Sequence, residues 1–170
     1  MEDTVVVSGL GAIGMGMLQF ALLRNPKRVI GIDTNDALCE IAKKLGAAEV
    51  LNPMKEDVTK RIMELTDGVG CDIYMEATGN PASVETGMNC LRKQGMLFIY
   101  SVFKKKAEID LNQISEFKEL RVIGGHLSPG AFPYTIDCLE KGKINAKVMV
   151  TDIFALNEID EAMSAKKPDR

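Results

Sequence analysis

Clustered metal-binding side chains are missing from this sequence of 170 residues, which has a single histidine and four widely spaced cysteines. No two cysteines form a CxxC pair, whereas a structural zinc site or a thioredoxin-type motif requires closely spaced ligands. Three of the four lie beside apolar residues in predicted helices or strands, so we predict buried, reduced thiols. The four are Cys39, Cys71, Cys90 and Cys138. We therefore predict neither a metal site nor a catalytic cysteine in this chain.

Long apolar runs and an excess of positive charge are also missing. The net charge of −3 offers no electrostatic footprint for nucleic acid or for an anionic membrane. No apolar run reaches about 18 residues, and Met1-Glu2-Asp3 leads straight into a predicted strand without a signal peptide. With 46% hydrophobic and 26% charged residues, the composition is that of one globular domain spanning residues 1–170, expected in the cytoplasm.

The most informative stretch is a glycine-rich turn between a predicted strand and a predicted helix. The strand contains Val5-Val6-Val7, and the turn reads Gly9-Leu10-Gly11-Ala12-Ile13-Gly14. Gly9 allows a sharp reversal, Gly11 lets a pyrophosphate approach the backbone, and Gly14 lets the helix pack closely on the sheet. The N-terminus of the helix offers unpaired N–H groups and the positive end of its dipole. This pattern predicts a phosphate-binding turn that needs no basic side chain.

An acidic residue completes the pattern of a dinucleotide-binding unit. A second apolar run, residues 28–32, ends at Asp33, which lies 22 residues beyond Gly11. At this spacing the carboxylate is expected to accept hydrogen bonds from the adenosine ribose. Because a carboxylate repels a 2′-phosphate, we predict a preference for NAD over NADP. The strand, the glycines, the helix and the acid together are far more specific than the glycines alone.

The rest of the chain alternates predicted strands and helices. Further strands are predicted at 49–51, 72–76, 96–100 and 121–123, the last as a core strand, with amphipathic helices between them. Two βαβαβ halves predict an α/β fold, a doubly wound parallel (Rossmann) sheet in the order 3-2-1-4-5-6. The turns after these strands are expected to converge on one crevice. They are Gly9–Gly14, Ala77–Gly79, Ser101–Phe103 and Gly124–Leu127.

Four stretches in fixed order resemble a known family. They read GLGAIGMGMLQFA, IAKKLGAAEVLNP, DGVGCDIYMEATGNPASVE and KGKINAKVMVTDIFALNEIDEAM. They are similar to the medium-chain, zinc-type dehydrogenases, especially the sorbitol and threonine dehydrogenase branch, over about Val5 to Met163. The resemblance implies hydride transfer between a secondary alcohol or polyol and NAD. It also implies that the N-terminal catalytic domain, which holds zinc in the family, is absent, so the chain alone is expected to be inactive.

The resemblance further implies which residues contact NAD. By this resemblance, the pyrophosphate would be bound by Gly9, Gly11, Ala12, Ile13 and Gly14, and the adenosine ribose by Asp33. The nicotinamide ribose would contact Tyr100, Ser101 and Val102, and the carboxamide edge would contact Gly125, His126 and Leu127. Thr78 would line the same crevice. His126 has no acidic or cysteine partner nearby in sequence, so backbone contact is favoured over a general-base or metal role. Leu38 departs from the sorbitol-type relatives, which usually have an arginine at this position beside the adenosine, and it equally fits a core-facing position of its helix.

Several alternatives stay open. A stand-alone NAD-sensing module shares the glycine turn and Asp33, and a methyltransferase using S-adenosylmethionine also has a glycine-rich first turn. Glu76, at the end of a predicted strand, either bonds nearby backbone N–H groups or touches the crevice. The apolar run Val148 to Phe154 is a candidate edge strand for homo-oligomer formation.

Overall fold

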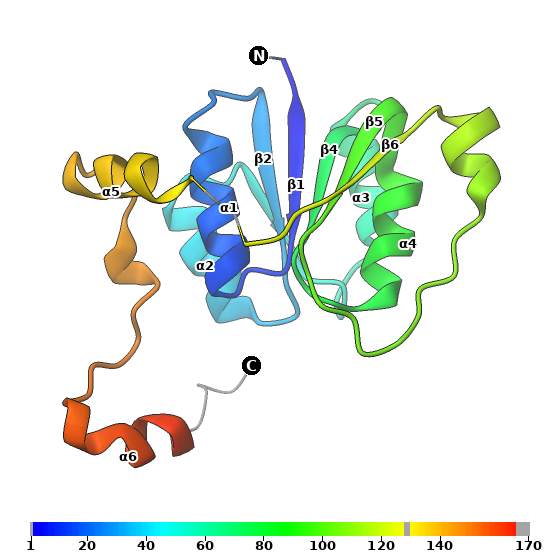
Figure 1. The fold of residues 1–170 in the computed structure, drawn as a ribbon. Coiled ribbons are helices and arrows are strands. Elements are labelled where there is room, and N and C mark those ends of the chain that lie inside the picture. Colours follow the sequence, from blue (N-terminus) through cyan, green and yellow to red (C-terminus); the bar gives the residue numbers. More distant parts are fainter. Residues whose placement is uncertain (1, 128–129, 166–170) are drawn as a thin grey trace.

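Buried apolar strands form a six-stranded parallel sheet at the centre of the molecule. The structure is a computed structural model that describes residues 2–127 and 130–165. The strand order is β3-β2-β1-β4-β5-β6, which confirms the doubly wound sheet (Figure 1). The strands are β1 (Thr4–Ser8), β2 (Arg28–Ile32), β3 (Glu49–Leu51), β4 (Cys71–Glu76), β5 (Leu91–Ile99) and β6 (Arg121–Gly124).

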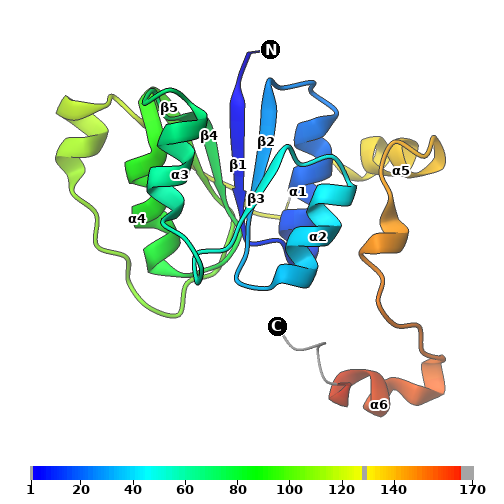
Figure 2. The ribbon, with the colours of Figure 1, turned by 180° about the vertical axis from the view of Figure 1, so that it is seen from behind.

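Helices cover opposite faces of the two halves of the sheet. The first pair, α1 (Ala12–Leu22) and α2 (Asp36–Lys44), packs on one face, and the second pair, α3 (Val58–Leu65) and α4 (Pro81–Cys90), packs on the other (Figures 1 and 2). The sequence Val5-Val6-Val7 shows the alternation directly. Val5 and Val7 join the core beneath α1, whereas Val6 joins the opposite core, because successive side chains of a strand point to opposite faces.

Polar side chains mark where these helices begin. The Asn35 side chain accepts a hydrogen bond from the N–H of Ala37 at the start of α2, and Asp57 accepts one from Lys60 at the start of α3. Asn80 does the same for Ala82 in α4, with Pro81 in the first turn. Each of these caps satisfies a donor that has no partner within its helix.

Two boundaries differ from the sequence prediction around β5. The strand predicted at 96–100 begins earlier, and the helix before it ends earlier, because Leu91 already has an extended backbone and opens β5, five residues before Met96. Lys118 explains the early end of α4, because its ammonium donates hydrogen bonds to the carbonyls of Met88, Asn89 and Leu91. Tertiary contacts therefore override the local helical pattern.

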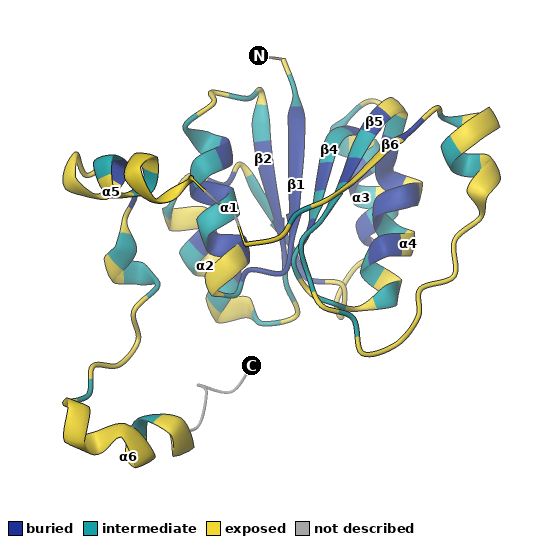
Figure 3. Cartoon of the chain, viewed as in Figure 1, coloured by how far each residue is buried: buried dark blue, intermediate teal, exposed yellow. Residues whose placement is uncertain are grey.

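The C-terminal part of the chain corrects two predictions. β6 forms as predicted, but all four of its residues are exposed, so it is an edge strand and not a core strand (Figure 3). No strand forms at 148–154. Asn145 instead caps a 3-10 turn (Ala146–Val148), and its N–H donates to the side chain of Gln19 in α1 at 2.7 Å. Beyond this turn, residues 150–153 are exposed and pair with no strand.

Two further helices complete the chain, α5 (Phe132–Glu140) and α6 (Ile159–Ser164). Tyr134 of α5 lies beside Phe20 of α1, with ring centroids 6.0 Å apart. Most of the surface of both helices is exposed (Figure 3). Within the described residues, no helix is both long and apolar enough to cross a membrane.

Candidate functional site

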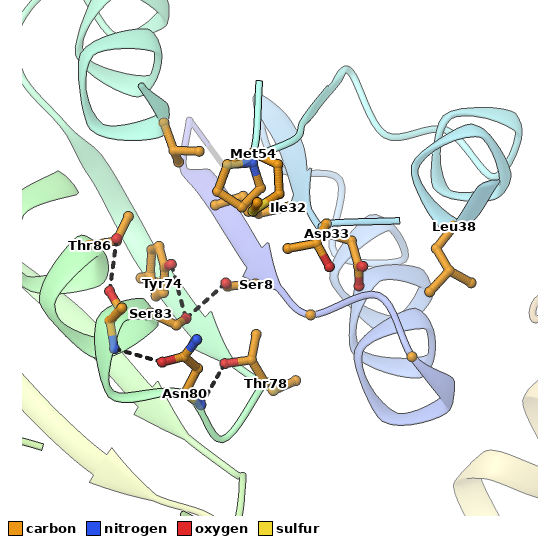
Figure 4. Close-up of a pocket in the computed structure, with 17 residues that line it drawn as sticks. Ser8, Ile32, Asp33, Leu38, Met54, Tyr74, Thr78, Asn80, Ser83 and Thr86 are labelled. Carbon is orange, nitrogen blue, oxygen red and sulfur yellow. Dashed lines mark hydrogen bonds between the residues drawn. The ribbon is translucent and has the colours of Figure 1, made fainter. Parts of the chain in front are cut away.

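A crevice of about 500 Å³ opens at the carboxyl ends of the central strands. It lies between the neighbouring strands β1 and β4, where the strand order reverses. From β1 the chain runs outward to β2 and β3, and β4 begins the other half of the sheet. One wall carries Asp33 and Leu38, and the other carries side chains from the β4–α4 turn and α4 (Figure 4). Ligands bind at this position in open α/β sheets.

Two glycines of the glycine-rich turn have no room for a side chain. Gly9 has a φ of +91°, and a Cβ there would lie 2.8 Å from the carbonyl carbon and oxygen of Ala77. A Cβ on Gly14 would lie 1.6 Å from the carbonyl oxygen of Gly9. Gly11 sits at the N-cap of α1 and provides no capping side chain, so the first N–H groups of the helix have no side-chain partner there. Such a turn brings bare backbone donors to the edge of the crevice.

Backbone hydrogen bonds hold the Asp33 carboxylate in place. Oδ2 accepts a hydrogen bond from the N–H of Leu10 at 2.7 Å, and Oδ1 accepts one from the N–H of Asn35 at 2.9 Å. The first of these bonds ties the end of β2 directly to the glycine-rich turn. Asp33 is half-buried and lines the crevice, so a negative charge of fixed position faces the ligand space.

The opposite wall contains a chain of hydroxyl groups that the sequence analysis missed. Tyr74 and Ser83 lie within hydrogen-bond distance, with oxygens 3.3 Å apart, and Ser83 in turn donates to Ser8 at 2.8 Å (Figure 4). Burial raises the pKa of the Tyr74 phenol, which keeps it protonated and neutral. The spacing of Asn80, Ser83 and Thr86, at i, i+3 and i+6 from the cap of α4, is a sequence signal for the part of this wall that α4 supplies, but not for Ser8 or Tyr74.

Glu76 is fully buried just behind this wall. Its Oε1 accepts hydrogen bonds from the N–H groups of Thr78 at 2.7 Å and Gly79 at 3.1 Å, and also from the Thr78 hydroxyl. Of the two roles left open by the sequence, the structure shows bonding to backbone N–H groups. Glu76 does not line the crevice.

Four of the predicted site residues meet in the crevice: Gly9, Gly11, Asp33 and Thr78. The structure brings a second set together in a neighbouring apolar groove, also of about 500 Å³, which runs along α1 past Phe98. That groove is lined by Ala12, Ile13 and Tyr100 of the predicted residues. Gly14 lies buried beneath the turn that separates the two.

The remaining predicted residues line neither hollow. The hydroxyl of Ser101 donates to the carbonyl of Glu76 at 3.4 Å, and a Cβ on Gly125 would meet the ring of Phe98 at 2.5 Å. Val102, His126 and Leu127 are exposed and line neither hollow. All four cysteines are buried and free, as predicted. No cluster of three or more potential metal-binding side chains occurs among the residues that the structure describes.

Comparisons with known proteins agree with this geometry. The family profile described as zinc-binding dehydrogenase matches residues 12–141. An erythritol/L-threitol dehydrogenase from Mycolicibacterium smegmatis is 40% identical over 162 residues, which make up 95% of this chain and 45% of that protein. An L-threonine 3-dehydrogenase from Pyrococcus abyssi is 34% identical, with coverages of 87% and 43%. The chain thus spans about half the length of the curated relatives it matches.

Two solved structures share the fold at somewhat lower identity. A zinc-binding dehydrogenase from Sinorhizobium meliloti, bound to NADP, superposes with a TM-score of 0.90 at 26% identity, covering 98% of this chain and 49% of that one. An alcohol dehydrogenase from E. coli in complex with NADH gives a TM-score of 0.88 at 26% identity, with coverages of 96% and 48%. Because the family profile matches most residues of this chain, the chain belongs to the zinc-binding dehydrogenase family.

Proposed function

We propose that the chain binds a nicotinamide dinucleotide and is the cofactor-binding half of a zinc-dependent dehydrogenase that transfers hydride between a secondary alcohol or polyol and NAD. The observation that carries the proposal is the shared crevice of the glycine-rich turn and the Asp33 carboxylate. A tight turn whose glycines Gly9 and Gly14 let it pack directly on neighbouring backbone, next to a helix N-terminus without a side-chain cap, fits a pyrophosphate. A fixed carboxylate beyond it fits a ribose diol.

The preference for NAD over NADP follows from charge. Both oxygens of Asp33 already accept backbone hydrogen bonds, so the carboxylate cannot easily turn away from a ligand. No lysine or arginine lines the crevice within the described residues, and Leu38 stands near Asp33 on the same wall. A 2′-phosphate would therefore meet a negative charge without a compensating cation, which disfavours NADP.

The residues of this chain bind and orient the cofactor, and the nicotinamide ring supplies the hydride acceptor when it is bound. We assign the pyrophosphate to the turn from Gly9 to Gly14 and the nicotinamide end to the side of Tyr100 and Ser101. The described residues offer no ligand cluster that fits zinc, so we assign no zinc-dependent step to them. In the proposed intact enzyme, the zinc ligands and the alcohol-binding pocket belong to residues outside this chain.

Binding of NAD, NADP and S-adenosylmethionine, measured by titration calorimetry, tests the proposal. We expect NAD to bind best and Asp33→Gly to lower the NAD/NADP affinity ratio by about tenfold or more, because the repulsive charge is removed. Asp36→Asn is the matched control, since Asp36 pairs with Lys55 and Asn52 and does not line the crevice. An unchanged ratio in Asp33→Gly would show that Asp33 does not select the cofactor. Binding of S-adenosylmethionine alone would favour a methyltransferase.

We also propose that the free edge of the sheet supports a homo-oligomer. β6 is an edge strand whose residues are all exposed, and it offers unpaired backbone groups to a second copy. It replaces the segment 148–154, which forms no strand, as the candidate interface. Analytical ultracentrifugation should show self-association that Val122→Pro weakens. The N–H of Gly125 donates to Ile99 of β5, so the alternation along the strand turns the N–H of Val122 toward the free edge, where proline removes a donor. A monomer at high concentration would refute this interface.

A further inference from the structure

Glu76 is the most deeply buried acidic side chain in the described residues, with 0% of its surface exposed. One of its oxygens, Oε1, accepts three hydrogen bonds from two consecutive residues, Thr78 and Gly79. The other oxygen, Oε2, is buried and has no hydrogen-bond partner among the described residues. An ionisable side chain is costly to bury, so this arrangement calls for a physical reason.

The turn held by Glu76 is wedged between two other turns. On one side, a Cβ on Gly9 would lie 2.8 Å from the Ala77 carbonyl and 2.9 Å from Cγ2 of Thr78. On the other side, a Cβ on Gly79 would lie 2.7 Å from the carbonyl oxygen of Val102. The turn after β4 therefore touches both the glycine-rich turn after β1 and the turn after β5.

Main-chain hydrogen bonds from the same residues fix the spacing further. The N–H of Ala77 donates to the carbonyl of Ser8 at 2.8 Å, and the N–H of Tyr100 donates to the carbonyl of Glu76 at 3.1 Å. A shift of the β4–α4 turn would thus be transmitted to both neighbours, because their contacts are already at the closest approach that glycine allows.

We propose that Glu76 is a positioning residue: its carboxylate fixes the Thr78–Gly79 turn, and through that turn it sets the spacing of the three turns that form the cofactor crevice. The inference rests on the proposed function, since it concerns the same crevice. Glu76 itself does not contact the ligand space, and Thr78 is the residue through which it acts. Two backbone N–H groups that point at one buried oxygen would lose their partner if that oxygen were removed.

Two substitutions of similar size separate positioning from packing. Glu76→Gln keeps an oxygen acceptor at the same reach, whereas Glu76→Met fills the same space without an oxygen acceptor. Ile62→Val is the matched control for general destabilisation, because Ile62 is fully buried in the hydrophobic core and belongs to α3, outside all three turns. Amide hydrogen exchange of the unliganded chain and NAD titration calorimetry are measured on all variants.

We expect Glu76→Met to speed exchange at the N–H groups of Thr78 and Gly79 by about tenfold or more and to weaken NAD binding by about tenfold. Glu76→Gln should keep the exchange rates at Thr78 and Gly79 and the NAD affinity close to those of the wild type. Ile62→Val should leave both the exchange rates and the affinity unchanged. If Glu76→Met does not fold, Glu76→Asp takes its place, since it keeps the charge but withdraws the oxygen from the turn. The same losses are then expected for Glu76→Asp.

Three results would overturn the inference. The first is wild-type exchange and wild-type NAD affinity in Glu76→Met. The second is weakened NAD binding in Glu76→Met without faster exchange at Thr78 and Gly79. The third is a loss of NAD binding in Ile62→Val equal to that in Glu76→Met. A wild-type chain that binds no dinucleotide would instead refute the proposed function. Hydrogen exchange distinguishes the two failures, because it reports on the turn without any ligand.

Discussion

The two ends of the candidate site lie in regions of contrasting construction. Residues 4–120 contain both hydrophobic clusters, in which Leu18, Ile30 and Leu97 are all 0% exposed. Residues 121–165 present many apolar side chains to solvent, among them Ile153 and Leu156, each 91% exposed (Figure 3). The glycine-rich turn and Asp33 belong to the first region, and Gly125 to Leu127 belong to the second.

This contrast shows where the folding free energy resides. Burial of apolar surface contributes about 25 cal/mol per Å², so exposed side chains of the second region add little to stability. The adenosine and pyrophosphate end of the crevice is thus held by the core of the chain. The end that we assign to the carboxamide depends on a segment with few buried contacts. Substitutions in residues 4–120 should therefore lower the unfolding free energy more than comparable substitutions in residues 121–165.

The largest expected effect comes from adding a methyl group to a glycine in the first region. Gly14→Ala places a Cβ against the Gly9 carbonyl oxygen, which is backbone and cannot rotate away, so we expect a loss of about 3 kcal/mol in unfolding free energy. At Gly124 in β6, a Cβ would meet no atom within 4 Å, so Gly124→Ala should change the unfolding free energy by less than about 0.5 kcal/mol. Urea unfolding measures both. Equal losses at the two positions would refute the contrast.

Truncation of apolar side chains provides the next test. Ile62→Ala removes a fully buried side chain and should cost about 3 kcal/mol or slightly less, whereas Leu156→Ala removes an exposed one and should cost less than about 0.5 kcal/mol. The urea midpoints of the two variants give the comparison. A large loss in Leu156→Ala would mean that residues 121–165 are covered in solution, and its dependence on protein concentration would show whether a second copy covers them.

The smallest expected effect is a fall in stability at alkaline pH that arises in the first region. Burial raises the pKa of the Cys90 thiol to about 11, and it also raises the pKa values of Cys71 and Tyr74. The unfolded chain ionises these groups at lower pH and then binds fewer protons than the folded chain. The contribution of Cys90 to stability is therefore fully present below about pH 8.5 and falls as the pH rises toward 11, by on the order of 2 kcal/mol.

Urea unfolding between pH 8 and 11 measures this fall. Cys90→Ala should lower stability at every pH because it leaves a small cavity, but it should also flatten the alkaline slope. A slope that is identical in wild type and Cys90→Ala would show that Cys90 does not contribute to it.

Much of the site was predictable because it depends on local backbone chemistry. Gly9, Gly14 and Asp33 occupy positions where only glycine fits or where a strand ends, and the spacing of these residues follows from the length of one βαβ unit. The hydroxyl wall of Ser8, Ser83 and Tyr74 was not predictable in this way. Its members lie on three elements, and only strand pairing and helix packing bring them together.

The errors have the same origin. The Val148–Phe154 run has the composition of a strand, but a strand needs a neighbour, and residues 150–153 are exposed and pair with no other strand. The pattern Val84, Met88, Leu91 is helical, yet the Lys118 ammonium ends α4 at Cys90. For α4, a side chain 27 residues away in sequence decides the local structure, and for residues 150–153 it is the lack of a pairing strand.

By itself, the sequence determined the order of the strands, the glycine-rich turn and the acidic end of β2, because hydrophobic periodicity and glycine spacing act over short stretches of chain. Only the tertiary structure decided that Glu76 holds the β4–α4 turn, that β6 is an exposed edge and that hydroxyl groups from three elements share one wall. These features depend on which distant backbone groups meet, and such meetings are set by the packing of the whole sheet and its helices.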